Sequence, residues 1–593
     1  MRVTILLLIL TAALAGCVST PAAELVEDSA SAGRVAARLF FNGPIITMEG
    51  KNPATVEAVV ALGDRIVFVG SERTARTSYP AALATDLQGH TLLPGFIDPH
   101  SHIGMVADTM GQADLSPPPV GTTRNFSDLM AALRAFKQRQ NLAPGEWLFA
   151  WGYDEGQLEE RRHITRTELD AAFPDNPVYL QHTSAHMGVA NSAALAVADI
   201  HDGSPDPEGG RIVRFPGTDR PTGLVQETAM YFFAGTAIAE AAPRKAELFH
   251  RAQDLYLANG ITTAGDGMSE PDGARLLQRV AAQGGLKLDV MLFPGAAILD
   301  NPSGWVEGDD KATATFGEYR NGLKFQGIKI IADGSPQGKT AFFTQPYLTP
   351  VAGCDSDCRG IPSLTQDALN RLFVEGYRQG RQLYVHSNGD ASIDMVLRAH
   401  EHAARQLAQP LDADRRTVVV HSQFVRPDQL QAYRRYRMVP SLFSNHPFFW
   451  GDQHVANLGP ERAGFLSPIP AAAALGLRFT NHSDATVTPI DPLLGLWTAV
   501  NRVSRSGAVI GAAQRATPYQ ALQAITANAA YQFFDEADRG TLAVGKLADF
   551  VVLDRNPLTV EPMAIRDIRV VQTVKRGVTV YQRDAAAALP TAD

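Results

Sequence analysis

Short apolar segments rich in β-branched residues recur along the chain, and each ends in titratable residues. Four of them are "GIKIIADG" with Lys329, "LYVHSNGD" with His386, "TVVVHSQF" with His421 and "LRFTNHSDA" with Asp484. Helix-like patterns separate them, and alternating strands and helices are typical of a parallel barrel or a doubly wound sheet. In a parallel barrel the carboxyl ends of the strands share one rim, so we expect these side chains to meet there.

The segment "FIDPHSH", residues 96–102, ends a further apolar run with two histidines one residue apart. Residues i and i+2 of a strand point to the same face, so His100 and His102 would direct two imidazoles at one point. Imidazole is the commonest protein ligand of metals. An isolated pair of this kind is more often two polar side chains in a loop, so the metal interpretation depends on the other segments.

Together the segments supply nitrogen and oxygen ligands suited to zinc or a similar divalent ion. The candidate ligands are His100, His102, His386, His421 and Asp484. Lys329 stands inside "GIKII", where burial of its ammonium group is unfavourable unless the side chain reaches outward to solvent. Beside a metal, carbon dioxide can carboxylate a lysine and so convert the cation into a bridging anion. A carboxylated Lys329 would explain its place in the strand.

The order HxH, Lys, His, His, Asp resembles the amidohydrolase superfamily. The similarity extends through "LLPGFIDPHSH", "GIKIIADGS", "YVHSNGDASID", "VVVHSQFVRPDQL", "NHSDATVTPIDP" and "GTLAVGKLADFVVLDRNPL". Within the superfamily the chain is similar to the amidohydrolase-3 branch, which contains N-substituted formamide deformylase. The segments "DGSPQGKTAFF" and "SLFSNHPFFWGDQH" depart from the better-known members and look like an exoenzyme-regulator-type subgroup.

The resemblance implies an α/β fold with a (β/α)8 TIM-type barrel and a small β-sandwich formed by the N- and C-terminal segments. A chain of 593 residues is too long for one compact core, so more than one domain is expected. The expected divisions are a lipoprotein signal peptide at 1–17, a flexible tether at 18–36, sandwich strands at 37–93, the barrel at 94–500 with insertions at about 105–225, closing helices at 501–539 and further sandwich strands at 540–585.

Two local elements are marked by their capping and turn residues. The tetrapeptide "LGDR" indicates a hairpin turn between two β-rich runs. A helix is expected to begin after Thr517, which forms a capping box with Gln520. Its apolar face continues through Leu522, Ile525 and Phe533, so one uninterrupted helix is predicted.

The resemblance also implies a binuclear site: His100, His102 and Asp484 on one metal, His386 and His421 on the other, and a carboxylated Lys329 as the bridge. It implies hydrolysis of a C–N amide-type bond, as in an N-acyl or N-formyl amine, by attack of a metal-bound hydroxide. Asp484 would move the proton to the leaving amine. An esterase or lactonase could use the same site. A mononuclear deaminase would use the same scaffold, but Lys329 counts against it. A non-catalytic metal-binding lipoprotein would have no need of an open metal beside a base.

Several polar or aromatic residues near the matched segments are candidates for substrate binding. They are His186, Glu227, His446, Trp450 and Arg502. For each of them a structural role is the alternative. His482 would orient a neighbouring side chain or form a hydrogen bond in the core.

The first residues resemble a bacterial lipoprotein signal. Arg2 precedes the apolar stretch "VTILLLILTAALA", which is too short to span a bilayer comfortably. The following "LAGC" resembles a lipobox and implies cleavage before Cys17 and lipid attachment to its thiol; an ordinary secretory signal is the alternative. Because Val18 and not aspartate follows the cysteine, we expect a lipid-anchored periplasmic protein of the outer membrane.

Removal of Cys17 from consideration leaves the two cysteines of "GCDSDCRG". In an oxidising compartment Cys354 and Cys358 are expected to form a local disulfide; a metal site is the alternative, but two thiols alone do not complete one. The net charge of −9 argues against a nucleic-acid partner, because phosphates need neutralising cations. The expected partners are therefore a small amide-type substrate and a membrane.

Overall fold

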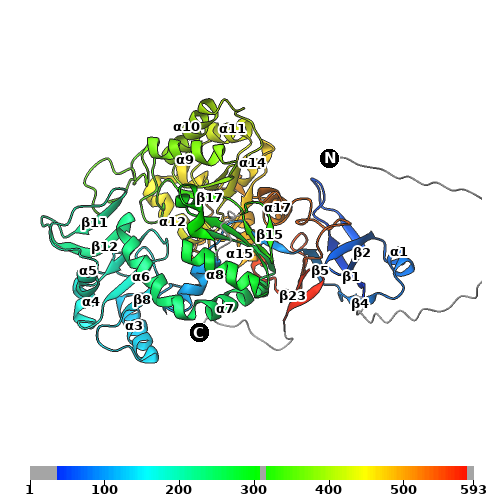
Figure 1. Cartoon of the computed structure of the whole chain (residues 1–593), viewed down its shortest axis with the longest axis horizontal. Helices are drawn as coiled ribbons and strands as arrows, with labels where there is room; N and C mark the ends of the chain where they lie inside the picture. Colours follow the sequence, from blue (N-terminus) through cyan, green and yellow to red (C-terminus); the bar gives the residue numbers. More distant parts are fainter. Residues whose placement is uncertain (1–35, 307–314, 584–593) are drawn as a thin grey trace, which may run out of the picture.

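Parallel strands joined by helices form the centre of the molecule, so the predicted α/β class is confirmed. The structure is a computed structural model that describes residues 36–306 and 315–583. In Figure 1 the central region lies between a sheet of terminal strands on the right and a smaller region on the left. The predicted signal peptide, and the predicted tether up to residue 35, lie outside the described residues.

Two sheets make up the central region. The first has the order β15-β16-β14-β13-β6, formed by Tyr319–Arg320, Leu323–Phe325, Asp289–Pro294, Ile261–Ser269 and Phe96–Asp98. The second has the order β17-β18-β19-β20-β21, formed by Ile328–Ile331, Leu383–Ser387, Val418–His421, Val439–Leu442 and Thr480–Asn481, and all its pairings are parallel. A single parallel bridge, Gly295 to Lys329, connects the two sheets. Within the described residues the strand pairings do not close into one continuous barrel.

Helices follow most of these strands and cover the sheets. Those around the central sheets are α2 (Ile103–Thr109), α7 (Lys245–Ala258), α8 (Pro271–Ala282), α9 (Gln366–Arg378), α10 (Asp390–Gln406), α11 (Pro427–Tyr436), α12 (His446–Leu458), α13 (Pro460–Gly464), α14 (Ile469–Ala474) and α15 (Pro492–Asn501). α9 illustrates why such a helix forms. Thr365 caps its N-terminus, and Leu369, Leu372 and Phe373 form its buried face.

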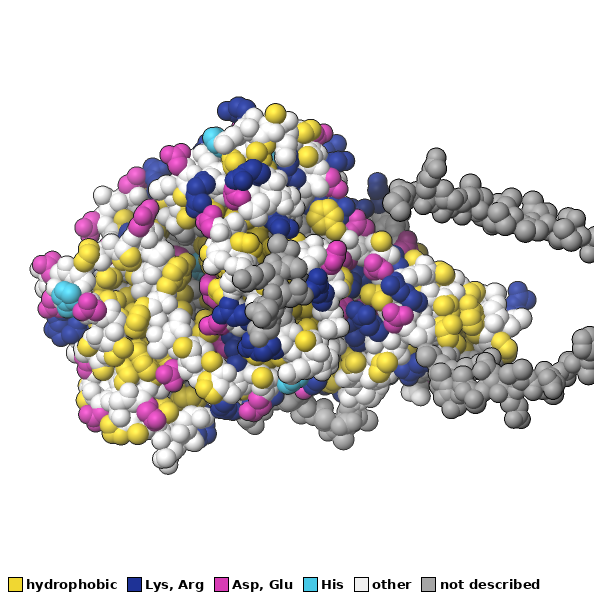
Figure 2. All heavy atoms as spheres, viewed as in Figure 1, with side chains coloured by type: hydrophobic (Ala, Val, Ile, Leu, Met, Phe, Trp, Pro, Cys, Tyr) yellow, Lys and Arg dark blue, Asp and Glu magenta, His cyan; other side chains and the backbone are white. Residues whose placement is uncertain are grey.

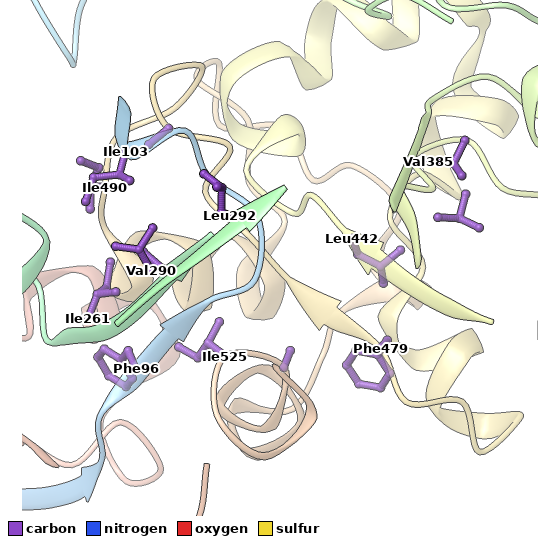
Figure 3. Packing of buried hydrophobic residues seen from close by; sticks show 14 of the residues in the cluster. Phe96, Ile103, Ile261, Val290, Leu292, Val385, Leu442, Phe479, Ile490 and Ile525 are labelled. Carbon is purple, nitrogen blue, oxygen red and sulfur yellow. The ribbon is translucent and has the colours of Figure 1, made fainter. Parts of the chain in front are cut away.

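The largest hydrophobic core joins the two central sheets. Figure 3 shows part of it, with buried side chains from β6, β13, β14, β18 and β20: Phe96, Ile261, Val290, Leu292, Val385 and Leu442. Each of these side chains is essentially inaccessible to solvent. Full burial of such a side chain stabilises a fold by about 1.5–3 kcal/mol, so the β-branched runs hold the strand ends in place.

The two ends of the chain meet in one eight-stranded sheet. Its order is β24-β23-β22-β5-β1-β2-β3, with β4 paired to β1, and its strands are Val578–Gln582, Val570–Lys575, Phe550–Leu553, Thr91–Pro94, Arg38–Ile46, Thr55–Leu62, Arg65–Gly70 and Leu83–Asp86. α1 (Glu72–Ser78) lies at its outer end (Figure 1). The predicted "LGDR" hairpin is confirmed, because β2 and β3 pair antiparallel around Gly63, whose φ is +60°.

The segment predicted as insertions contains a sheet of its own. Its order is β11-β12-β10-β9-β8-β7, formed by Gly210–Arg214, Pro221–Glu227, Met187–Ala190, Val178–His182, Leu148–Tyr153 and Ala113–Asp114. The helices of this region are α3 (Phe126–Gln140), α4 (Arg166–Ala172), α5 (Ser192–Val197) and α6 (Tyr231–Ala241). A separate core that includes Leu129, Leu148 and Leu180 holds the sheet together.

One apolar run divides between two sheets, and the prediction of one uninterrupted helix is wrong. The apolar run before "FIDPHSH" divides at Gly95, so that β5 joins the terminal sheet while β6 joins the central one; a Cβ at Gly95 would lie 2.4 Å from Thr262 Oγ1. The helix after Thr517 has the predicted capping box but splits into α16 (Pro518–Ala524) and α17 (Ala527–Gln532). The break places the carbonyl of Ile525 where it accepts a hydrogen bond from Ile97 of β6 at 2.9 Å.

The helices and the surface bear on the relation of the protein to a membrane. Among the described residues, none of the helices combines the length and the apolar character that a bilayer span requires. Figure 2 shows acidic and basic side chains interspersed over one face, with neither sign dominating.

Candidate metal centre

All six residues predicted as metal ligands lie at one end of the central strands. His100 and His102 follow β6, Lys329 is in β17, His386 is in β18, His421 ends β19 and Asp484 follows β21. These strands are parallel within their sheets, so their carboxyl ends share one side of the molecule. The structure therefore brings together side chains that are up to 384 positions apart in sequence, from His100 to Asp484.

The first half of the group centres on Asp484. Its Oδ1 lies 3.3 Å from Nε2 of His100 and 3.3 Å from Nε2 of His102. Nδ1 of His102 is 2.8 Å from the carbonyl of Gly267, which it reaches as a donor, and this tautomer leaves a lone pair on Nε2. Nζ of Lys329 lies 2.9 Å from Nε2 of His100. Asp484 Oδ1 is buried and accepts no hydrogen bond from the described residues.

The second half contains three further histidines. Nδ1 of His386 lies 2.9 Å from Nε2 of His421, and on the other side of the ring Nε2 of His386 lies 3.0 Å from the Asn388 amide. His482 was not predicted as a ligand, yet it has a ring nitrogen within 4.8 Å of ligand atoms of His421 and Asp484. Both ring nitrogens of His482 are buried without a hydrogen-bond partner in the described part of the chain. His482 therefore joins the predicted ligands as a candidate.

Burial sets the protonation states of this group. It lowers the pKa of His100, His386 and His421 well below the usual value, so these imidazoles are neutral. Burial opposes ionisation of Asp484, but the nearby His102 outweighs it and the pKa of Asp484 is lowered. Neutral imidazoles and an ionised carboxylate are the forms that bind a cation.

Lys329 is the exception in the group, because it adds a positive charge. Its side chain is 2% exposed, and burial lowers the pKa of its ammonium from 10.5 to about 7, although Asp484 acts in the opposite direction. The described residues provide no salt bridge to Nζ within 4 Å. A lysine with this environment is close to balance between the neutral amine and the ammonium at neutral pH.

A small cavity adjoins His386, His421 and Asp484. Its other walls include Ser184, His186, Gln337, Phe443, His446 and Val487. Two predicted substrate residues, His186 and His446, therefore line it. Glu227 stands behind His186, whose Nδ1 lies 2.8 Å from Glu227 Oε2. Ser184 and His186 come from the segment after β9, so the inserted sheet supplies one wall of the cavity.

The remaining two substrate candidates lie away from the cavity wall. Trp450 donates from Nε1 to Asp154 at 2.7 Å and packs its ring against His446, with 4.5 Å between the ring centroids. Arg502 is 1% exposed and donates to the carbonyls of Ile510 and Leu466 at 2.7 and 2.9 Å. The prediction that Arg502 binds substrate is not supported by its position, because its donors are taken up by backbone oxygens. It fixes the chain after α15.

Sequence reasoning missed a second group of polar residues beside the cavity. Asp154 and Glu155 follow β8 and His182 ends β9, which is the same strand-end pattern that marked the main site. His182 Nε2 lies 2.8 Å from Glu155 Oε2, and His182 Nδ1 accepts from the backbone N–H of Ser184 at 3.0 Å. That bond places the imidazole proton on Nε2, facing Glu155. Among the described residues neither His182 Nε2 nor Glu155 Oε2 has a hydrogen-bond partner, and with Asp154 these residues form a second group whose ligand atoms lie within 4.8 Å of one another.

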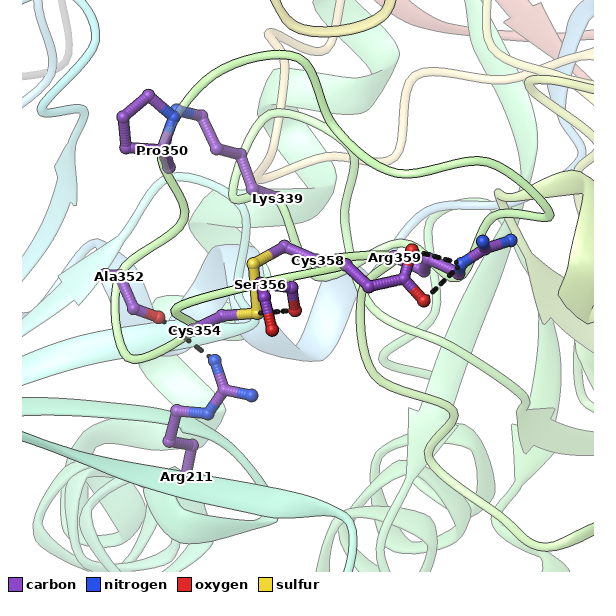
Figure 4. The surroundings of a disulfide bond; sticks show 9 residues. Arg211, Lys339, Pro350, Ala352, Cys354, Ser356, Cys358 and Arg359 are labelled. Atoms are coloured by element: carbon purple, nitrogen blue, oxygen red, sulfur yellow. Dashed lines mark hydrogen bonds and ion pairs between the residues drawn. A yellow bond between two sulfur atoms is a disulfide. The ribbon is translucent and has the colours of Figure 1, made fainter.

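The two remaining cysteines lie in a separate loop. Cys354 and Cys358 are joined by a disulfide, and Arg211 of the inserted sheet donates to the carbonyl of Ala352 in the same loop at 3.0 Å (Figure 4). Neither cysteine lines the cavity. Cys17 lies outside the described residues.

Comparison with known proteins gives matches over most of the chain. The sequence profile of the Amidohydrolase family matches residues 84–581. N-substituted formamide deformylase from Arthrobacter pascens is 28% identical over 554 residues, which cover 92% of this chain and 98% of that protein. The exoenzymes regulatory protein AepA from Pectobacterium carotovorum subsp. carotovorum is 27% identical over 406 residues, which cover 67% of this chain and 82% of that protein.

The fold has solved counterparts. The crystal structure of an uncharacterized metal-dependent hydrolase from Pyrococcus horikoshii OT3 superposes with a TM-score of 0.68 at 22% sequence identity. The superposition covers 89% of this chain and 99% of that chain. Agreement over so much of both chains shows that the two proteins share their fold.

Proposed function

This chain belongs to the Amidohydrolase family, and on that basis we propose that it hydrolyses the C–N bond of an N-acyl or N-formyl amine. The predicted resemblance is confirmed, including the similarity to N-substituted formamide deformylase and to an exoenzyme regulator. The protein is a metal-dependent hydrolase acting on C–N bonds. The choice of acyl and formyl amines rests on the name of that deformylase and on the cavity described above.

One observation carries the proposal. Nε2 of His100 and Nε2 of His102 both face Asp484 Oδ1, and no hydrogen bond from the described residues reaches that oxygen. Buried polar atoms are nearly always paired, so an unpaired carboxylate oxygen between two imidazole nitrogens fits a bound cation. Nitrogen and oxygen donors of this kind suit zinc or a similar divalent ion. His386 and His421 offer a second pair of ligand nitrogens, so the residues suffice for one or two ions.

A divalent ion held by these residues would polarise the substrate carbonyl and lower the pKa of a water molecule beside it. The ionised carboxylate of Asp484 accepts the proton of the attacking water and returns it to the nitrogen of the leaving amine. His102 keeps its Nε2 directed at the site because Gly267 holds its Nδ1 proton. Phe443 and Val487 form an apolar part of the cavity wall beside Asp484.

We also propose that Lys329 is carboxylated by carbon dioxide in the active protein. Its side chain is almost completely buried, and among the described residues its ammonium makes hydrogen-bonding contact with His100 alone. A carbamate there would replace a cation among metal ligands by an anion that can bridge two ions. Mass spectrometry of native protein, before and after acidification, tests the carbamate through the loss of one carbon dioxide mass.

The closed barrel is likewise part of the proposal. Two runs of parallel strands support it: β6-β13-β14 and β17-β18-β19-β20-β21. The bridge from Gly295 to Lys329 joins them, as it would join two arcs of a (β/α)8 barrel. We further propose that Cys17 carries a lipid that anchors the mature protein in the periplasm, at the outer membrane. "LAGC" after an apolar run supports this location.

A hydrolysis screen tests the main proposal. Chelator-treated protein reloaded with zinc is assayed against N-formyl and N-acyl amines, dipeptides, esters and lactones, with Asp484→Asn prepared in the same way as the control for contaminants. We expect amine release from formyl or acyl amines that stops on metal removal. Cleavage of esters or lactones alone would contradict the proposal in favour of an esterase. Equal rates in Asp484→Asn would assign the activity to another protein.

A further inference from the structure

α12 places three ring side chains on one face, at intervals of four residues: His446, Trp450 and His454. His446 lines the cavity with His421 and Asp484, and its ring packs against Phe443, with 4.6 Å between the ring centroids. His454 lies one layer farther from the cavity and is completely buried. The pair therefore runs from the interior of the protein to the cavity wall.

The two histidines are joined through one nitrogen of each ring. Nδ1 of His446 lies 2.9 Å from Nε2 of His454, and the rings are nearly parallel, with an interplanar angle of 5°. Burial lowers the pKa of both, that of His454 to about 3, so both rings are neutral. A single proton lies between them, and it belongs either to His454 Nε2 or to His446 Nδ1.

The surroundings of His454 decide between these two states. Its other nitrogen, Nδ1, is buried and has no hydrogen-bond partner among the residues that the structure describes. If His446 were the donor, the neutral His454 ring would carry its own proton on Nδ1, as a buried N–H without an acceptor. Orphaned buried N–H groups are rarer in proteins than unpaired acceptors. His454 therefore donates from Nε2, and its Nδ1 is left as a bare nitrogen.

This assignment fixes the tautomer of His446 as well. Since Nδ1 of His446 accepts the proton of His454, the neutral ring must carry its own proton on Nε2. Nδ1 and Nε2 point away from each other, so the N–H is directed away from His454, in a residue that itself lines the cavity.

We propose that His446 presents a fixed, uncharged Nε2–H donor to the cavity, and that this donor binds the carbonyl oxygen of the substrate as negative charge develops on it. His454 acts as a positioning residue, because it selects the tautomer without touching the cavity. The proposal rests on the proposed function, since it requires a substrate with an acyl carbonyl. A donor N–H at this wall favours substrates that place an uncharged carbonyl oxygen against His446. It disfavours substrates that place a cationic group there.

Kinetics of paired variants test the role of His454. His454→Phe removes the donor, whereas His454→Gln retains an amide N–H at a similar position. Removal of one oxyanion donor commonly lowers kcat about 100–1000-fold, so a tautomer that is no longer fixed should lower kcat at least about ten-fold with little change in KM. His454→Gln should restore most of the rate. His400→Phe is the matched control, because His400 is buried and hydrogen-bonded on α10 to Tyr377 and Leu411.

Nitrogen NMR of the metal-free, histidine-labelled full chain reads the tautomer without any substrate. Protonated and bare ring nitrogens give well-separated signals, and the His446 pair is identified by its loss in His446→Gln. We expect a protonated Nε2 and a bare Nδ1 in the wild type, and a mixed state in His454→Phe. A protonated Nδ1 in the wild type overturns the proposal, as does an equal kcat loss in His454→Phe and His454→Gln. Failure of the hydrolysis screen alone would reject the amide substrate and leave the tautomer result standing.

Discussion

Replacement of Lys329 by methionine should make the metal-free protein more stable while weakening its metal binding. The ammonium is 2% exposed, and burial lowers its pKa from 10.5 to about 7. At about 1.4 kcal/mol per pKa unit, holding this lysine in the fold costs about 4 kcal/mol at pH 7 in the absence of metal and carbamate. Methionine fills a similar volume without a charge, so Lys329→Met should recover a large part of that free energy of unfolding.

The free energy of unfolding of the apoprotein should also depend on pH, and the pKa shift of Lys329 fixes the direction of that dependence. Between pH 7 and 10.5 the unfolded chain binds the lysine proton more tightly than the folded chain does. The free energy of unfolding of the wild-type apoprotein should therefore rise with pH in that window, by up to about 1.4 kcal/mol per unit. Lys329→Met lacks the group and should lack this part of the rise. Urea titrations of chelator-treated protein at pH 7 and pH 9, followed by tryptophan fluorescence, measure both quantities.

Lys324 provides the matched control. It is a second buried lysine, 2% exposed, but its Nζ lies 2.6 Å from Asp535 and 2.8 Å from the carbonyl of Phe533. Lys324→Met removes one of the partners of the buried carboxylate of Asp535, which keeps Tyr319 and Arg539, and should destabilise the protein by up to the roughly 3–5 kcal/mol that breaking a buried pair costs. A Lys329→Met apoprotein that is less stable than the wild type at pH 7, or that keeps the full pH dependence, would refute the reasoning.

Three further predictions concern the site, the loop and the N-terminus. Asp484→Asn should lower kcat at least about 100-fold while metal affinity falls about 10–100-fold, as measured by kinetics and metal analysis; unchanged kcat in the metal-loaded variant would remove the carboxylate from proton transfer. Replacement of Cys354 and Cys358 by serine should leave kcat within about two-fold, because surface changes away from a site rarely exceed about 0.5 kcal/mol; a large loss would show that the loop supports the cavity. Cys17→Ser should move the protein from membrane to soluble fractions, and mass spectrometry of an unmodified mature N-terminus in the wild type would end the lipid proposal.

Local sequence patterns were sufficient to predict which polar residues lie at the carboxyl ends of the central strands. The pattern of a β-branched run followed by a polar residue located His386, His421 and Asp484, because parallel strands place their last residues on one side, whereas Lys329 stands out as a lysine inside its strand. His182 ends a run of the same kind in the inserted segment, so the pattern holds there too. His482 precedes Asp484 by two residues, which is the spacing of His100 and His102, and the same rule of alternating strand residues would have included it.

Long-range packing explains what local patterns could not predict. At Gly95, where one apolar run passes from the terminal sheet to the central one, Thr262 lies so close that no side chain would fit. Arg502 looks like a free cation in the sequence, but backbone carbonyls of Leu466 and Ile510 take up its donors. The role of His454 depends on the lack of a partner at Nδ1 among the described residues, which is a property of the folded interior. None of these facts is encoded within a few residues of the position concerned.

The terminal sheet combines strands from both ends of the chain, so it cannot be completed until the last strands have been synthesised. β5 pairs with β1 on one side and with β22 on the other, and β22 to β24 follow every other strand of the sheet in the order of synthesis. Until residues 550–582 emerge, β5 carries an open edge that can pair with another nascent chain. A prematurely terminated chain would keep that edge permanently. Synthesis of residues 550–582 is therefore expected to be the step that covers this edge.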